Sequence, residues 1–237
     1  MKRTAIVLAI ALSAGGLSAA LAAEKVDHLE PYWSALGTEL SDHRKLVIRT
    51  VFHDAWDRDI LLRMHSDDGA LGAEEYVIAL KSQNGKYSVV NFHTSHRLGS
   101  YWFAPPLPLQ MGPKKIPPME PTPKDYRDIK PTRCEIAVTP GLAKRIVATW
   151  QSALMETRYY EEEPRPPVDG GWYEFSMENN DQTLAGTIPD GAEDGSKPAR
   201  LMSIALDMRI LCMDRTAKAR TALETDLAAF EKQYGSR

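Results

Sequence analysis

Five of the six histidines in this chain of 237 residues fall in one stretch, between residues 43 and 96. They are His43, His53, His65, His93 and His96. Histidine is a common metal ligand, and the spacing of His93 and His96 suits two rings that approach one ion. A transition-metal site needs three or four ligands at one point, however, and no cysteine lies nearby in the sequence. Surface or hydrogen-bonded histidines are the preferred interpretation, and no metal or other cofactor is predicted.

The two cysteines, Cys134 and Cys212, are the second group with chemistry of their own. Cysteines in an exported protein often pair, because the compartment outside the cytoplasm is oxidising. Cys134 and Cys212 are therefore the disulfide candidates. The alternative is two separate buried thiols, each acting as a small apolar side chain.

Motifs that identify common enzyme classes are missing from the sequence. It contains no Gly-x-Ser-x-Gly elbow, no Gly-x-x-x-x-Gly-Lys or Gly-x-Gly-x-x-Gly loop and no His-Glu-x-x-His helix. Carboxylates gather at Asp54, Asp57 and Asp59, but this segment is predicted to be a turn, where aspartate usually bonds to the local backbone. No catalytic residue is assigned from the sequence.

Aromatic and acidic residues occur together in ways that suggest binding. The places are 101–103 (Tyr-Trp-Phe), 159–163 (Tyr-Tyr-Glu-Glu-Glu), and Trp172 with Glu174. Exposed aromatic rings beside carboxylates can contact a protein partner or hold a cationic ligand. The alternative is that these rings cover the edge of the core while the acids keep the protein soluble.

The first 22 residues have the pattern of a secretory signal peptide. Lys2 and Arg3 precede an apolar run over residues 5–12, and the segment ends in Ala20-Leu21-Ala22. This pattern predicts cleavage after Ala22 and export from a bacterial cytoplasm. No later segment is apolar for long enough to span a membrane. The net charge of −3 gives no reason to expect nucleic-acid binding, so we expect a soluble periplasmic or secreted protein.

The elements that would position these residues begin with a short helix from Pro31, in which Trp33, Leu36 and Leu40 share one face. An antiparallel meander of four or five strands follows. Its predicted strands are residues 46–53, 60–64, 75–81 and 87–93, with 99–104 as a possible addition. The Asn84-Gly85 pair predicts a tight type I′ turn. Residues 104–133 hold nine of the sixteen prolines and read as an extended connection or surface arm.

The second half is predicted to be richer in helix. Residues 134–138 form a strand, and a helix capped by Thr139 runs from Pro140 to about residue 159 or 160. Residues 172–178 and 183–188 form a hairpin. Residues 199–234 carry one apolar stripe without Gly or Pro, which predicts one long helix or two nearly collinear ones. A break near residues 214–216 is the alternative.

The predicted fold class is α+β, with the meander in the first half, then a helix, a hairpin and a long C-terminal amphipathic helix that packs on the meander. Residues 23–237 are predicted to form a single composite domain. The sequence favours a non-enzymatic protein of the cell envelope that binds another envelope protein or an external ligand. The alternative is an envelope hydrolase with a non-local site, assisted by a metal at His53, His93 and His96.

Overall fold

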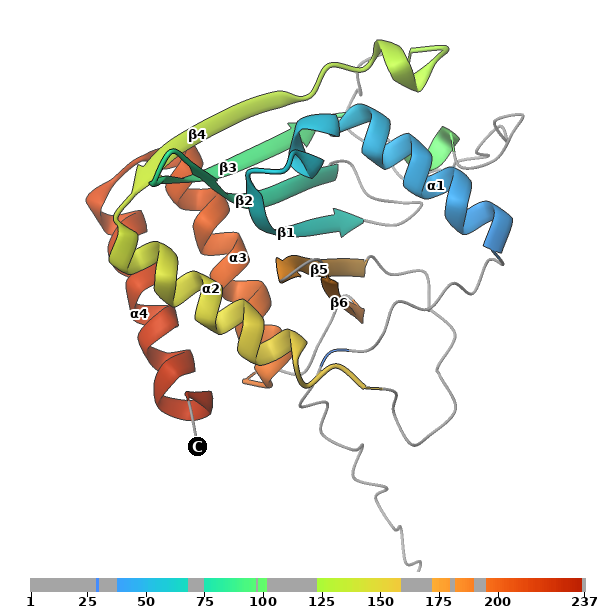
Figure 1. Cartoon of the computed structure of the whole chain (residues 1–237). Helices are drawn as coiled ribbons and strands as arrows, with labels where there is room; N and C mark the ends of the chain where they lie inside the picture. The colour runs from blue at the N-terminus through green and yellow to red at the C-terminus, as the bar shows by residue number, and fades with distance from the viewer. Residues whose placement is uncertain are drawn as a thin grey trace, which may run out of the picture.

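Six antiparallel strands make one sheet in the part of the chain that the structure describes, in the order β4-β3-β2-β1-β5-β6 (Figure 1). This computed structural model describes residue 29 and residues 38–67, 75–96, 98–101, 123–158, 172–179, 182–189 and 195–235. The strands are β1 (Ile60–Asp67), β2 (Glu75–Gln83), β3 (Lys86–Thr94), β4 (Thr132–Val138), β5 (Trp172–Asn179) and β6 (Gln182–Pro189). The helices are α1 (Thr38–Val51), α2 (Pro140–Leu154), α3 (Lys197–Asp214) and α4 (Ala217–Tyr234). The predicted α+β class is confirmed, with most strands in the first half and helices at the C-terminal end.

Some predictions fall outside the described residues. They are the signal peptide at residues 1–22, the start of the helix predicted from Pro31, and residues 104–122 of the proline-rich connection. The rest of that connection contains a short 3-10 helix, η4 (Tyr126–Asp128), and the start of β4.

Helices α2, α3 and α4 cover one face of the sheet (Figure 1). The strands alternate, as the pleat requires, so that Leu62 and Met64 of β1 face these helices. At the centre of this core, the ring of Trp150 on α2 packs edge-on against Phe175 on β5, with 5.6 Å between the ring centroids. Thr139 caps α2 as predicted, because its hydroxyl accepts a hydrogen bond from the backbone N–H of Leu142.

Helix α1 lies on the other face of the sheet (Figure 1). Val47 and Val51 of α1 belong to a second apolar cluster, together with Val77 of β2 and Val90 of β3. The predicted strand over residues 46–53 is therefore wrong. The segment contains the β-branched residues Val47, Ile48 and Val51, which are common in strands, but here they recur at helical spacing. One side of the helix is therefore buried, whereas Leu46 stays 54 % exposed.

Two further boundaries differ from the predictions. Residues 99–101 lie in a 3-10 turn, η3 (Leu98–Tyr101), instead of a strand. Helix α2 ends at Leu154, five residues or more before its predicted end. The chain leaves the helix there, and the backbone N–H of Arg158 donates to the carbonyl oxygen of Leu29.

The C-terminal stretch forms two packed helices, which confirms the predicted alternative of a break near residues 214–216 and makes the single long or collinear helix wrong. The break falls at residues 215 and 216, where Arg215 has a left-handed backbone conformation with φ of 55°. Thr216 then caps α4 through the N–H of Ala219. Because Tyr234 at the end of α4 bonds to Gly195, just before α3 begins, the two helices run antiparallel.

The two halves of the sequence meet in the sheet. Strand β1 pairs with β5, so that Met64 lies opposite Phe175. Helix α3 packs against β2, β3 and β4, which is the contact with the meander that the length of its apolar stripe required. The Asn84-Gly85 turn between β2 and β3 is confirmed by positive φ values of 53° and 75°. None of the described helices combines the length and the apolar character that a membrane span needs.

Candidate functional site

The sheet face that carries α1 changes from apolar to polar across the strands. Under α1 it presents Val77, Val90 and Phe92. On the neighbouring strands it presents polar side chains, which the register places side by side. Arg63 lies opposite Ser176, His65 opposite Glu174, and Glu174 opposite Thr187; Glu75, at the start of β2, completes the set. We call Arg63, His65, Glu75, Glu174, Ser176 and Thr187 the polar face.

Five of these six side chains are deeply buried. Relative exposure is 8 % for Arg63, 4 % for His65 and for Glu75, and 3 % for Ser176 and for Thr187. Burying polar and charged groups costs free energy unless they are well paired, and apolar residues would fill the same volume without that cost. A cluster of this kind is therefore a candidate for function, because packing alone does not require it.

His65 is the central residue of the polar face. Its Nε2 atom lies 3.7 Å from Oε2 of Glu75, which is too long for a hydrogen bond. This nitrogen makes no hydrogen bond within the described residues. The pKa of His65 is lowered to about 4, chiefly by burial and in part by the charge of Arg44 on α1, whereas Glu174 opposes the shift. The ring is thus neutral at pH 7, with one nitrogen able to accept a hydrogen bond and the other to donate one.

Arg63 supplies a positive charge two residues before His65, on the same side of β1. Its guanidinium lies 5.1 Å from the ring centroid of Trp56 and 3.7 Å from Oε1 of Glu178. Burial lowers the pKa of Arg63, while Glu178 and Glu174 oppose this shift, and an arginine remains charged at any physiological pH. The polar face therefore combines a fixed cation, two carboxylates and a neutral imidazole.

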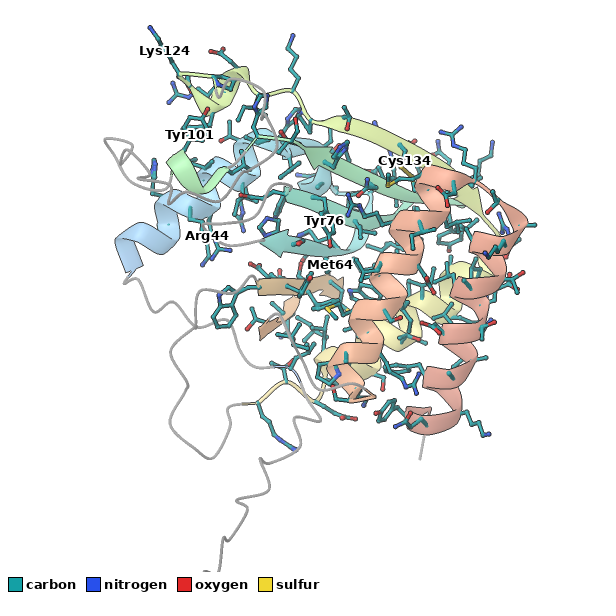
Figure 2. The ribbon with its side chains drawn as sticks, turned by 180° about the vertical axis from the view of Figure 1, so that it is seen from behind. Arg44, Met64, Tyr76, Tyr101, Lys124 and Cys134 are labelled. Atoms are coloured by element: carbon teal, nitrogen blue, oxygen red, sulfur yellow. A yellow bond between two sulfur atoms is a disulfide. The ribbon has the colours of Figure 1, made fainter. Side chains whose placement is uncertain are left out.

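The arrangement separates this face from the main core. Figure 2 shows Arg44 on α1, and Met64 and Tyr76 on the strands nearer to α3. Tyr76 packs under Arg209 of α3, with 4.1 Å between the guanidinium carbon and the ring centroid. Residues that alternate along β1 and β2 thus serve two different environments.

The histidines predicted as alternative metal ligands are not brought together. His53 is largely exposed and lies 2.8 Å from Asp54, whereas His93 bonds to the hydroxyl of Thr132. Nε2 of His43 donates to the backbone oxygen of Tyr101 over 2.9 Å. Within the described residues, no three His, Cys, Asp or Glu side chains could hold a metal ion together. The set of His53, His93 and His96 therefore has no geometric support as a metal site.

The cysteine candidates lie close together. Cys134 on β4 and Cys212 on α3 are at disulfide distance, with 5.9 Å between their Cα atoms. This spacing falls in the range typical of paired cysteines. The pair connects an outer strand of the sheet to the helix layer.

The aromatic groups singled out in the sequence differ in their placement. Trp172 is half-buried at the start of β5, two residues before Glu174 and on the same side of the strand. Tyr101 is buried, and its hydroxyl donates to the backbone oxygen of Pro123. Residues 102, 103 and 159–163 lie outside the described part of the chain.

Four residues of the polar face were not predicted from the sequence: Arg63, Glu75, Ser176 and Thr187. The usable signal was the alternation along β1, where Arg63 and His65 fall between Leu62 and Met64. Alternation separates two faces of a strand, but it does not show that the polar one is buried.

Comparison of the sequence with models of protein families gives no match, and comparison with curated proteins gives no significant relative.

Proposed function

We propose that this chain is an exported, non-enzymatic binding protein of the cell envelope and that its ligand binds at the polar face. The observation that carries the proposal is the burial of His65, Arg63 and Glu75 beside one another on one side of the sheet. Binding sites in proteins are commonly built from a few converging polar groups within an apolar surrounding. The apolar cluster under α1 provides that surrounding.

The chemistry of the polar face favours a polar ligand. Arg63 offers hydrogen-bond donors with a positive charge, Glu174 offers acceptors with a negative charge, and neutral His65 can do either. A ligand with both donors and acceptors matches this set. An external small molecule and a polar segment of another envelope protein both meet the requirement.

The same groups are less suited to acid–base catalysis. A general acid or base works best when its pKa lies near the working pH. With a pKa of about 4, His65 is a weak base at neutral pH and lacks the second ring proton that an imidazolium would give as a general acid. This supports binding over hydrolysis for the polar face.

Export is the second part of the proposal. It rests on the predicted signal peptide and agrees with the close approach of Cys134 and Cys212, because disulfides persist in oxidising compartments. The protein would then bind its ligand in the periplasm or in the external medium.

The test uses the chain purified from the compartment to which the host delivers it. Native mass spectrometry would identify small molecules that co-purify with it, and immobilised protein would be exposed to envelope extract to identify protein partners. The wild type is compared with His65→Gln and Glu174→Gln, which keep side-chain size. His53→Gln is the matched control, because His53 lies outside the polar face and is largely exposed.

We expect one ligand to accompany the wild type and the His53→Gln variant, and to be lost or weakened about tenfold or more in the two polar-face variants. A ligand that binds all four proteins equally would place the site elsewhere. Retention of an intact residue 1 on active, cytoplasmic protein would contradict export.

A further inference from the structure

Strand β4 is the outer strand at one side of the sheet and pairs only with β3 among the described strands. The opposite outer strand, β6, is buried over residues 186–188, whereas most residues of β4 are exposed or half-exposed. An exposed outer strand presents backbone N–H and C=O groups that can pair with another strand. The edge of β4 is therefore the more accessible place to extend the sheet.

The charges on β4 alternate with the pleat. Arg133 and Glu135 lie on the same face of the strand, two residues apart, and their side chains form an ion pair 2.5 Å long. Cys134, between them, points to the other face, toward α3. The strand thus carries one positive and one negative group symmetrically about Cys134.

Neighbouring residues hold both charged side chains in place. Ser88 of β3 donates a hydrogen bond to Oε1 of Glu135, and Arg133 lies over the ring of Phe92 at 5.5 Å. Both side chains still keep about two fifths of their surface exposed, 38 % for Arg133 and 41 % for Glu135. A partner strand would meet side chains that are already oriented, which lowers the entropy cost of association.

We propose that the edge of β4 is a pairing surface for a second copy of this chain, related by a two-fold axis that passes near Cys134 perpendicular to the sheet. In an antiparallel pair, residues that lie directly opposite must share a face of the sheet. A two-fold axis at Cys134 then places Arg133 opposite the partner's Glu135, and Glu135 opposite the partner's Arg133. The two sheets join into one continuous sheet through an isologous contact.

Other registers of the same pair lack this complementarity. An axis at Arg133 would put two arginines opposite each other, and an axis at Glu135 would put two glutamates opposite each other. Like charges at directly opposed positions destabilise a strand pair, whereas opposite charges stabilise it. The order of charges along β4 therefore selects one register and favours a second copy over an unrelated strand.

The experiment measures oligomeric state by sedimentation equilibrium of the oxidised full chain from low to high micromolar concentration. We expect a reversible dimer for the wild type. Arg133→Glu and Glu135→Arg each create opposed like charges, and each is expected to raise the dimer dissociation constant about tenfold or more. The double variant R133E/E135R restores the alternation and is expected to recover the dimer.

Circular dichroism and a thermal melt would verify that each variant is folded, and Arg127→Glu, on an exposed residue outside the strand, is the matched charge control. Hydrogen exchange provides a second readout, because β4 amides should become more protected as the concentration rises. A wild type that stays monomeric overturns the proposal, even if β4 is then found to pair with a strand of another protein. A dimer that survives both single reversals, or a folded double variant that stays monomeric, overturns it as well.

Discussion

Nε2 of His65 on β1 and Oε2 of Glu75 on β2 lie 3.7 Å apart, and both side chains are about 95 % buried. The pair belongs to the polar face, next to the apolar residues under α1, because His65 lies opposite Val77 of β2. A histidine in this place is held neutral by burial, although a carboxylate is close. Its protonation is therefore coupled to the stability of the fold.

Stability should fall in acid because of His65. Its pKa is about 4 in the folded chain against 6.5 in the unfolded chain, so the unfolded state binds the proton first as the pH falls. The contribution is fully present above pH 6.5 and is lost progressively toward pH 4, by roughly 3 kcal/mol in total. Urea unfolding at steps between pH 7.5 and 4.5 measures this slope.

The variant His65→Gln removes the titrating group and should flatten the slope, whatever its effect on stability at neutral pH. The groups that face His65, namely Arg44, Glu75 and Glu174, stay in place. His53→Gln, at an exposed position, should leave the slope unchanged. An equal slope in wild type and His65→Gln would show that folding does not shift the pKa of His65.

Asp207 on α3 should act in the opposite direction. The pKa of Asp207 is raised to about 6, chiefly by burial and in part by the neighbouring carboxylate of Asp226. The folded state therefore holds this proton more tightly than the unfolded state, and the contribution to stability grows as the pH falls from about 6 toward 4. Asp207→Asn should raise the unfolding midpoint at pH 7.5 and remove this part of the pH dependence.

Asp226 itself accepts a hydrogen bond from the hydroxyl of Ser203 over 2.5 Å. The pH ranges in which His65 and Asp207 affect stability overlap. The variants His65→Gln and Asp207→Asn are therefore measured singly and together. A midpoint at pH 7.5 that does not rise in Asp207→Asn would mean that neither burial nor Asp226 disfavours the ionised form of Asp207.

Local sequence patterns predicted most strands and the Thr139 cap of α2, because these depend on neighbours in the chain. The alternation in β5 and the Asn84-Gly85 turn are examples. The segment at residues 46–53 was misassigned because β-branched residues favour strands in general, whereas here their spacing buries one side of α1. A break near residues 214–216 was the predicted alternative, and it falls at the left-handed residue Arg215, but the antiparallel packing of α3 and α4 was not predicted.

The candidate site was harder to predict than the fold. His65 and Glu174 were visible as residue types, but they are 109 positions apart and meet only because β1 pairs with β5. The pairing of strands from the two halves is a property of the whole sheet. The burial of Arg63 and Glu75 depends on the same long-range packing, and periodicity does not report it.

The cysteine pair should contribute substantially to stability. It closes a loop with a sequence separation of 78 residues, for which the chain-entropy model gives about 4 to 5 kcal/mol. Peptide mapping without reduction should show Cys134 joined to Cys212 in protein from the exporting host. Reduction, or Cys212→Ser, should lower the urea midpoint markedly, with Ser95→Ala as a control at an exposed polar residue. Two thiols that are readily alkylated in the native protein would contradict the pairing.

Gly186 on β6 should resist any larger side chain. A Cβ atom there would lie 2.8 Å from Cβ of Leu29 and 2.8 Å from Oγ1 of Thr157, inside van der Waals contact. Leu29 is itself fully buried against the main core, and its carbonyl oxygen binds the N–H of Arg158. The sheet, the end of α2 and the segment around Leu29 therefore meet at a position where only glycine leaves enough room.

Gly186→Ala should destabilise the fold by about 1 to 3 kcal/mol, because it overpacks a closed core. Gly141→Ala is the matched control, since no atom lies within 4 Å of a Cβ at that position in the first turn of α2. There alanine should be neutral or stabilise by up to about 1 kcal/mol. Urea unfolding of both variants compares the two sites directly. Equal stability of the two would mean that Leu29 does not occupy this place in the folded chain in solution.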